Sequence, residues 1–401
     1  MVSMHTSPIA TPGIGDSGGM NVSLLSVASE LARRGVEVDL LTRASGAPCV
    51  TELNSGVTLY ELAAGPVGTI EKGRLFEITD EFGEAVADLA GRLHPRYDIL
   101  HAHYWLSGLA TLPVALELRL PFVQSFHSVA AMKNGSLAPR QVPEPEQRVR
   151  TEMYLANQAN AIVAGSSAEV GTLIDDLHAP ADRIWVIPPG VDVDLFTPAR
   201  EDAASARFRD ELAIASGRPI LAMVGRVQPL KDQELAIRAL AELHALRGWA
   251  PVLIIAGEAT PKEAEYAVSL RTIATELGVF DEVRFVGALS RERLADLFAA
   301  ATVTLVPSHS ETFGLVALES AASGTPVIAF RGGGLIDSVA SGVSGQLIDS
   351  HDPRAWARAI AEMLDDSARL ERLSGSARHH AEGYTWAATA TALLGVYAGL
   401  P

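Results

Sequence analysis

The chain almost lacks cysteine. Among its 401 residues, Cys49 is the single one. A lone cysteine excludes an intrachain disulfide framework and any zinc site built from several cysteines. Cys49 is as compatible with a plain core position as with a special role. Neither disulfides nor a thiolate metal centre is therefore expected.

Long apolar runs are missing as well. Hydrophobic residues make up 48% of the chain, yet no run reaches the 18 apolar residues of a membrane span. Residues 1–12 lack the basic start and the apolar stretch of a signal peptide. We therefore expect neither membrane insertion nor secretion, and a location in the cytoplasm.

Positive charge is scarce. The chain has 32 basic and 48 acidic residues, a formal net charge of −16, which argues against a nucleic-acid or anionic-membrane partner. Four of the basic residues are lysines and 28 are arginines; the lysines are Lys72, Lys133, Lys231 and Lys262. An ammonium group is a compact charge with rotatable donors, so each retained lysine is a candidate anion contact, unless codon bias spared it by chance.

Short apolar segments alternate with helical stretches, which is typical of βαβ units around parallel sheets. Expected strands of a first domain are 36–42, 99–102, 121–126, 161–164 and 184–187. Expected strands of a second domain are 219–224, 251–255, 283–286, 303–306 and 326–329. The segment 187–198, rich in proline, suits a linker. We therefore predict an α/β fold of two doubly wound, Rossmann-like parallel-sheet domains, 1–195 and 196–383, which face each other across a cleft. The last segment, 384–401, is predicted to be a helix that packs back on the first domain.

The most informative motif is a pair of glutamates eight positions apart, Glu311 and Glu319. They follow the buried strand 303–306, and Gly314 between them opens an apolar helix. The free N–H groups of a helix N-terminus favour an anion such as a diphosphate. Carboxylates repel phosphate, so we expect them to bind hydroxyl groups on either side of it. This pattern indicates a nucleotide sugar.

A glycine-rich loop near the start permits two interpretations. Gly13, Gly15 and Gly18 match G-x-G-x-x-G, and Asp39 follows about twenty residues later, as in dinucleotide-binding oxidoreductases. That fingerprint needs a strand running into its first glycine, whereas prolines precede it here. We favour a loop that gives the backbone close access to phosphate or sugar oxygens.

Two cations follow the first strand of the second domain, Arg226 and Lys231. A nucleoside diphosphate develops negative charge as it leaves the sugar, and fixed cations stabilise that charge. Solvated surface charges are the alternative. Because the carboxyl ends of parallel strands meet at one edge of a sheet, we favour a functional role beside Glu311 and Glu319.

Two other strand ends carry polar side chains. His101 and His103 could form a metal pair, but no third ligand is evident nearby, and a polar contact through Tyr104 is the better interpretation. His127 and Ser128 end the next strand. An exposed histidine there could contact a sugar hydroxyl or move a proton, although a satisfied core histidine is an equal alternative.

Taken together, the glycine loop, the two cations and the glutamate pair resemble the retaining glycosyltransferases of family four, which have the GT-B fold. Further segments look like motifs of the members that act on an inositol phosphate; they begin at Ser3, Gly15, His103, Ala130 and Ser323. The resemblance covers nearly the whole chain. The glutamate spacing marks the broad family, whereas the segments at Ser3 and His103 are far more specific.

The resemblance implies transfer of N-acetylglucosamine from UDP-N-acetylglucosamine to 1D-myo-inositol 3-phosphate, the first step of mycothiol biosynthesis, with retention of the anomeric configuration. UDP-N-acetylglucosamine would be the co-substrate. No cofactor or metal would be required, because cations and a helix dipole already face the diphosphate. The departing phosphate would accept the acceptor's proton after front-face attack. Both partners would be small molecules, and a homodimer is compatible with this interpretation.

The resemblance also assigns residues. The donor-binding set is Gly19, Arg226, Lys231, Glu311, Phe313, Gly314, Leu315 and Glu319. The acceptor-binding set is Asn21, Lys72, Tyr104, Ser128 and Arg148. The catalytic set is His127, Arg226, Lys231 and Glu311, with no metal ligand. Glu311 would hold the sugar hydroxyls, Glu319 the ribose, and His127 would contact the sugar near the reacting carbon. Ser128 stands where the family usually has threonine and keeps the hydroxyl donor.

The chain departs from the family pattern in two places. Family members usually carry five or more residues before the segment that starts at Met4, and without them we expect the first sheet to lose most of a central strand. The loop 256–260 also differs from the usual glycine-rich sequence. Two alternatives to the implied enzyme remain: a related transferase with another cyclitol or sugar acceptor, and a sugar-nucleotide-binding protein without catalysis.

Overall fold

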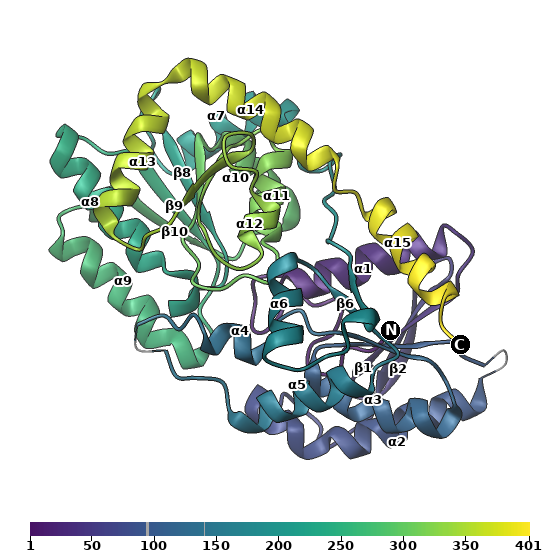
Figure 1. Ribbon diagram of the computed structural model, residues 1–401. Helices are drawn as coiled ribbons and strands as arrows, with labels where there is room; N and C mark the ends of the chain where they lie inside the picture. Colours follow the sequence, from purple (N-terminus) through teal and green to yellow (C-terminus); the bar gives the residue numbers. More distant parts are fainter. Residues whose placement is uncertain (94–95, 140) are drawn as a thin grey trace.

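Two sheets organise the chain (Figure 1). The computed structural model describes residues 1–93, 96–139 and 141–401. The strands of the first half are β1 (Val38–Arg43), β2 (Cys49–Asn54), β3 (Val57–Leu62), β4 (Leu100–His103), β5 (Phe122–Ser125), β6 (Ala161–Ala164) and β7 (Ile184–Val186). Those of the second half are β8 (Ile220–Val224), β9 (Val252–Ala256), β10 (Val283–Gly287), β11 (Val303–Val306), β12 (Val327–Phe330) and β13 (Gly345–Ile348).

The first sheet is joined in its middle by the first residues of the chain. One part has the order β1-β3-β2 and the other β4-β5-β6-β7. Val2 pairs in parallel with Leu41 of β1 and with Ala102 of β4. Residues 1–3 therefore occupy the position of a central strand. They form only isolated bridges there, so the position is filled by a very short segment.

The second sheet has the order β10-β9-β8-β11-β12-β13, and its strand pairs are all parallel. The strand order reverses between β8 and β11, which are neighbours in space although β9 and β10 lie between them in sequence. In an open α/β sheet, a crevice forms at the carboxyl ends of the strands at such a reversal. The first sheet has a corresponding reversal where residues 1–3 lie beside β4. Both crevices are candidate binding sites.

Every strand predicted from the sequence exists, with ends within two residues of those predicted. Three strands were missed, β2, β3 and β13. Five of the six residues of β2 are exposed, so it lacks the apolar run of a buried strand. It pairs antiparallel with β3 at the sheet edge, and Cys49 lies exposed on it. The suggestion that Cys49 is a core residue was therefore wrong.

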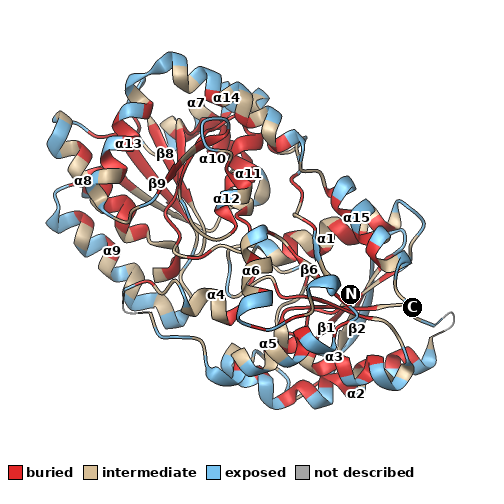
Figure 2. Cartoon of the chain, in the orientation of Figure 1, coloured by how far each residue is buried: buried red, intermediate tan, exposed pale blue. Residues whose placement is uncertain are grey.

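Helices cover both faces of each sheet, with their buried sides turned inwards (Figure 2). The first half contains α1 (Gly19–Ala32), α2 (Thr79–Arg92), α3 (Trp105–Leu118), α4 (Ala130–Asn134), α5 (Glu146–Gln158) and α6 (Ser167–Asp175). The second half contains α7 (Glu201–Glu211), α8 (Gln233–Arg247), α9 (Ala264–Glu276), α10 (Arg291–Ala300), α11 (Leu315–Ala322), α12 (Leu335–Ser338), α13 (Pro353–Asp365) and α14 (Ser367–Glu382). Within the described residues, no helix combines the length and the apolar character needed to cross a membrane.

The last helix, α15 (Trp386–Ala398), leaves the second half and lies beside α1 (Figure 1). Trp386 and Leu393 belong to the same buried cluster as Val22 and Leu31 of α1. At the crossing, Val191 pairs with Thr385. Two separate segments therefore connect the halves, and both lie close to the cavity described next.

Candidate active site

A cavity of about 390 Å³ opens between the two halves, and both supply its walls. The predicted site residues that line it are Gly19, Lys72, Tyr104, His127, Ser128, Arg226, Lys231, Glu311, Phe313, Gly314, Leu315 and Glu319. Asn21 and Arg148 do not line it. Gly19 and Glu319, which are 300 positions apart in the sequence, thus meet in one cavity.

One wall is the start of α11. Strand β11 ends at Val306, and the loop after it carries Glu311 before the helix begins at Leu315. Gly314 turns the chain into the helix with a φ of 102°, a left-handed conformation that glycine adopts without strain. No side chain caps α11, and while Ala317 donates its N–H to the Gly314 carbonyl, the N–H groups of Leu315 and Val316 are left for a ligand. This end of α11 suits an anion.

A cation lies beside that helix end. Nζ of Lys231 is 2.5 Å from Oε1 of Glu311, and the same oxygen accepts a hydrogen bond from Oγ of Ser308 at 2.9 Å. Lys231 ends a short 3-10 helix, Pro229–Lys231, whose Leu230 carbonyl accepts the N–H of His309. The loops that follow β8 and β11 are therefore held together, with an ammonium and a carboxylate side by side in the cavity.

Glu319 is buried inside α11. Its Oε1 pairs with Nη1 of Arg291 at 2.9 Å. Burial raises the pKa of Glu319, and Arg291 offsets part of that shift. Arg291 starts α10 and also lines the cavity. Arg291 was not predicted from the sequence, although its place a few residues past an expected strand was an available signal.

Asp16 is a second residue that the sequence reasoning missed. Its Oδ1 lies 3.1 Å from Nζ of Lys72 and 3.5 Å from Nη1 of Arg226. This carboxylate therefore bridges one cation from each half of the chain. Asp16 belongs to the glycine loop, and this loop lies close to the second half of the chain. A Cβ added at Gly19 would lie only 2.9 Å from Cδ1 of Leu315.

The opposite wall carries a second basic cluster. Lys72 Nζ lies 4.8 Å from the centre of the Tyr104 ring, and the Arg148 guanidinium carbon lies 4.9 Å from the same centre. Burial lowers the pKa of Lys72, while Asp16 acts in the opposite direction. Tyr104 adopts φ of 75°, rare for a side chain of this size, directly between β4 and α3. A strained residue in a cavity often marks a binding site.

Arg148 supports this wall from behind. Its guanidinium contacts Glu152 at 2.7 Å, Glu144 at 2.9 Å, and Oγ of Ser128 at 3.1 Å. Burial acts against its charge, but the Tyr104, Glu152 and Glu144 groups raise the pKa of Arg148 overall. Because Ser128 accepts from Arg148, its own hydroxyl proton is left for another acceptor. The structure thus places Arg148 one layer behind Ser128 and Tyr104.

Asn21 also acts inside the protein. Its Oδ1 accepts the N–H of Gly18, and its Nδ2 donates to the Ser7 carbonyl and to Thr6. It therefore fixes the glycine loop. Asp39 lies away from the cavity and accepts a hydrogen bond from Tyr97 at 2.8 Å. The oxidoreductase alternative depended on Asp39 as part of the dinucleotide fingerprint, and Asp39 does not line this cavity.

His127 follows β5 and also lines the cavity, with φ of 57°. Its carbonyl accepts a hydrogen bond from Oγ1 of Thr312 at 2.8 Å, which ties the loop after β5 to the loop beside Glu311. Burial lowers the pKa of His127 to about 4. The ring is therefore neutral near pH 7, and it can donate one hydrogen bond without carrying charge.

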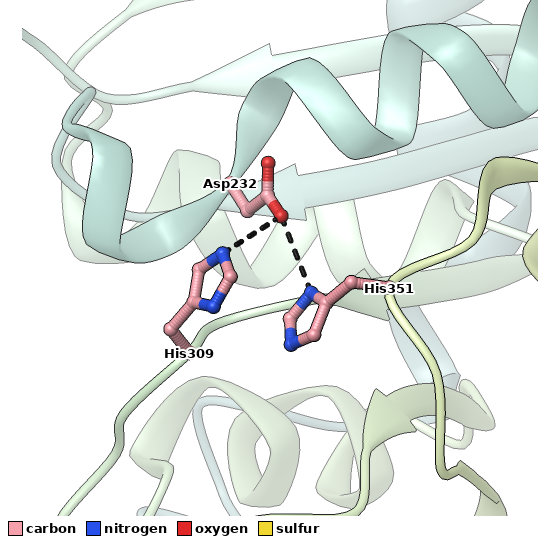
Figure 3. A group of neighbouring side chains, drawn as sticks. All are labelled: Asp232, His309 and His351. Carbon is pink, nitrogen blue, oxygen red and sulfur yellow. Dashed lines mark hydrogen bonds and ion pairs between the residues drawn. The ribbon is translucent and has the colours of Figure 1, made fainter. Parts of the chain in front are cut away.

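Asp232, His309 and His351 form the strongest metal candidate within the described residues (Figure 3). One carboxylate oxygen of Asp232 lies 3.1 Å from His309 and 3.3 Å from His351. The two rings stack at 3.9 Å with planes 6° apart. A ligating nitrogen holds an ion in its ring plane, and one ion cannot lie in both of two stacked planes. Burial alone would raise the pKa of Asp232, but the neighbouring His309 and His351 lower it to about 2. His309 is hydrogen-bonded to Asp232, and His351 lies within ion-pair distance of the same oxygen. The absence of a metal requirement stays a prediction.

Two parallel-sheet units that share a cavity, with cations and a helix N-terminus on one wall, are the features of a nucleotide-sugar-dependent transferase. Residues 17–195 match the family described as Glycosyltransferase Family 4, and residues 205–380 match Glycosyl transferases group 1. The chain belongs to these glycosyltransferases, and the predicted GT-B fold is confirmed.

Known relatives span the whole chain. It is 42% identical to the D-inositol 3-phosphate glycosyltransferase of Thermobifida fusca (strain YX), over 99% of this chain and 92% of the relative. It is similar to the structure of sucrose-phosphate synthase from Thermosynechococcus elongatus, with TM-score 0.87, 30% identity, and coverage of 99% and 97%. The fold is also that of Anabaena Alr3699/HepE in complex with UDP-glucose, with TM-score 0.79, 21% identity, and coverage of 98% of each chain.

Proposed function

We propose that the protein transfers N-acetylglucosamine from UDP-N-acetylglucosamine to 1D-myo-inositol 3-phosphate, with retention of the anomeric configuration. One observation carries the proposal: two clusters of hydrogen-bond donors, one from each half of the chain, face a single cavity. Arg226 and Lys231 stand with the start of α11 on the donor side. Lys72, Tyr104 and Ser128 form the other cluster. Two phosphate-bearing substrates account for both clusters, whereas a neutral acceptor leaves the second without a purpose.

The donor would lie along the second half of the chain. The diphosphate is held by Arg226, Lys231 and the N–H groups of α11, and the positive end of the helix favours its charge. Glu311 binds sugar hydroxyls through the carboxylate that now pairs with Lys231. Glu319, already held by Arg291, binds the ribose. The relatives named D-inositol 3-phosphate glycosyltransferase support this assignment.

The acceptor would bind on the first half, with its phosphate at Lys72, Tyr104 and Ser128. Arg148 assists from behind, because its guanidinium donates a hydrogen bond to Oγ of Ser128 and so orients that hydroxyl. The Asp16 carboxylate lies between Lys72 and Arg226, so it separates the acceptor phosphate from the donor diphosphate. Lys72 and Arg226 offset part of the mutual repulsion of the two anions, because each cation faces one of them.

In the reaction, the bond from the anomeric carbon to the diphosphate oxygen breaks, and a hydroxyl oxygen of the acceptor bonds to that carbon on the same face. The acceptor proton passes to the departing phosphate oxygen. The protein aligns the two substrates and stabilises the growing charge on the leaving group through Arg226 and Lys231. Because these cations and the helix dipole carry that charge, we propose that no metal ion is needed.

The test is a two-substrate assay on the full chain, with UDP release followed over time and the product identified by mass. Inositol without phosphate is the matched acceptor, and UDP-glucose the matched donor. We expect transfer with UDP-N-acetylglucosamine and inositol 3-phosphate, and a large loss with either replacement. Equal rates with unphosphorylated inositol would refute the acceptor assignment. UDP-sugar binding by a folded sample, without turnover on any acceptor, would indicate a binding protein.

A further inference from the structure

Three histidine rings, those of His101, His103 and His127, stand in a row along the wall of the cavity. His101 and His103 lie on β4 two positions apart, so their side chains share one face of the sheet. The ring centres of His101 and His103 are 4.2 Å apart, and those of His103 and His127 are 5.0 Å apart. Nδ1 of His103 lies 2.7 Å from Nε2 of His127, which is a hydrogen bond. The row therefore runs from the loop after β5 to strand β4.

Burial lowers the pKa of His103 and of His127, so both rings are neutral near pH 7. A neutral imidazole carries one N–H, and the bond between the rings contains one proton. Two arrangements satisfy it. In the first, His103 donates from Nδ1 and His127 keeps its proton on its own Nδ1. In the second, His127 donates from Nε2 and His103 carries its proton on Nε2.

The surroundings of His103 distinguish these arrangements. Its Nε2 is buried and has no hydrogen-bond partner among the described residues. The second arrangement would therefore bury an N–H donor without an acceptor, whereas the first leaves a lone pair there. Orphaned buried N–H groups are the rarer of the two in proteins. His101 does not compete for the proton, because Tyr397 and Ser125 satisfy its two nitrogens at 2.6 and 2.9 Å.

The first arrangement fixes what His127 presents to the cavity. With Nε2 occupied by His103, the nitrogen left for a ligand is Nδ1, and it carries the proton. The Thr312 hydroxyl holds the His127 backbone beside Glu311, on the donor side. We propose that His103 is a positioning residue that holds His127 as the Nδ1–H tautomer, so that His127 donates a neutral hydrogen bond to an oxygen of the donor sugar. The sugar as ligand rests on the function proposed above; the tautomer does not.

The tautomer can be measured without turnover. Nitrogen-15 labelling of the histidines, with long-range nitrogen to carbon-bound-proton NMR spectra, reports which ring nitrogen carries the proton, and His127→Gln assigns the signals. We expect the Nδ1–H form of His127 in the unaltered full chain at pH 7.5. The Nε2–H form there would overturn the proposal, whether or not the protein transfers sugar. Loss of the proposed function with the Nδ1–H form present would leave this inference standing.

Variants at position 103 test the cause. His103→Leu removes the donor, so His127 should shift towards Nε2–H, while His103→Asn can donate from its amide and should retain Nδ1–H. His101→Gln is the matched control, because it changes a neighbouring buried histidine that does not contact His127. An unchanged His127 signal in folded His103→Leu, or an equal shift in His101→Gln, would contradict the proposal. If His103→Leu fails to fold, the unaltered chain and His103→Asn still decide it.

Activity gives a second readout. His103→Leu should lower kcat by about tenfold, the effect of one lost hydrogen bond in the transition state, and leave the KM for the acceptor unchanged. His103→Asn should restore most of the rate. In a His127→Ala background, His103→Leu should have no further effect on kcat, because the two residues act through one hydrogen bond. Additive losses would indicate a general structural role instead.

Discussion

Replacement of Lys231 by alanine tests the donor side most directly. Lys231 lies 2.5 Å from Glu311, and both side chains are largely buried, with exposures of 20% and 16%. The variant removes a fixed cation from the leaving group and leaves the Glu311 carboxylate in the cavity without its partner. Removing one preorganised charge-stabilising group costs about 10²- to 10³-fold in kcat. We therefore expect Lys231→Ala to retain about 1% of the turnover or less.

The assay measures initial rates of UDP release at saturating acceptor, with kcat and the donor KM determined separately. Lys262→Ala is the matched control, because Lys262 is exposed in the short 3-10 helix Pro261–Glu263 and does not line the cavity. Thermal unfolding of both variants shows whether the fold is retained. Turnover of a folded Lys231→Ala within about threefold of the unaltered chain would refute the electrostatic role, since that corresponds to well under 1 kcal/mol of barrier.

Three further perturbations have defined outcomes. Gly314→Ala should lower the melting temperature and weaken UDP binding, because the added Cβ would lie 2.7 Å from Leu335 and the φ of this residue is 102°. Gly375→Ala in α14 is the control, because the added Cβ meets nothing there. Equal melting temperatures of the two variants would contradict this prediction. Ser128→Ala should raise the KM for the phosphorylated acceptor about tenfold, because a hydrogen bond to a charged group is lost. Ser128→Thr keeps the hydroxyl and should not raise this KM, when both are measured with the donor saturating. An unchanged KM for Ser128→Ala would remove Ser128 from the acceptor site. Burial raises the pKa of Glu169 to about 7, above the value of about 4.3 in an unfolded chain. The folded state therefore binds this proton more tightly, and stability should fall as pH rises from about 4.5 to 7. Glu169→Gln should flatten that part of the melting-temperature profile, and an unchanged slope would contradict the assignment.

Some of the fold was readable in the sequence because it depends on local pattern. The apolar runs of β8, β9 and β11 are buried on both faces, so they stand out from the helices that separate them. β2 was missed for the opposite reason, since it lies at a sheet edge with its side chains in solvent. β13 was missed because it begins at a glycine, and glycine is not typical of a strand interior.

The candidate site was readable to the extent that it follows strand ends. Arg226 and Glu311 come directly after β8 and β11, and the parallel arrangement brings such loops to one edge. Arg148 shows the limit of this reasoning. Its role beside the acceptor cluster was inferred from a motif, whereas its burial behind Ser128 depends on how α5 packs against the loop after β5. A sequence motif specifies residue types, and packing decides which of them face the cavity.

The sequence by itself determined the α/β class, which strands are followed by functional residues, and the resemblance to a glycosyltransferase family. Periodicity and motif spacing are properties of neighbouring residues, so they can be recognised without the tertiary structure. The tertiary structure alone decided which distant groups meet. Asp16 reaches Arg226 across 210 positions, and His127 is held by both His103 and Thr312. These contacts depend on how the two sheets face each other, and on the burial that keeps the histidines neutral. No local pattern encodes that relation, since it arises from the packing of the whole chain.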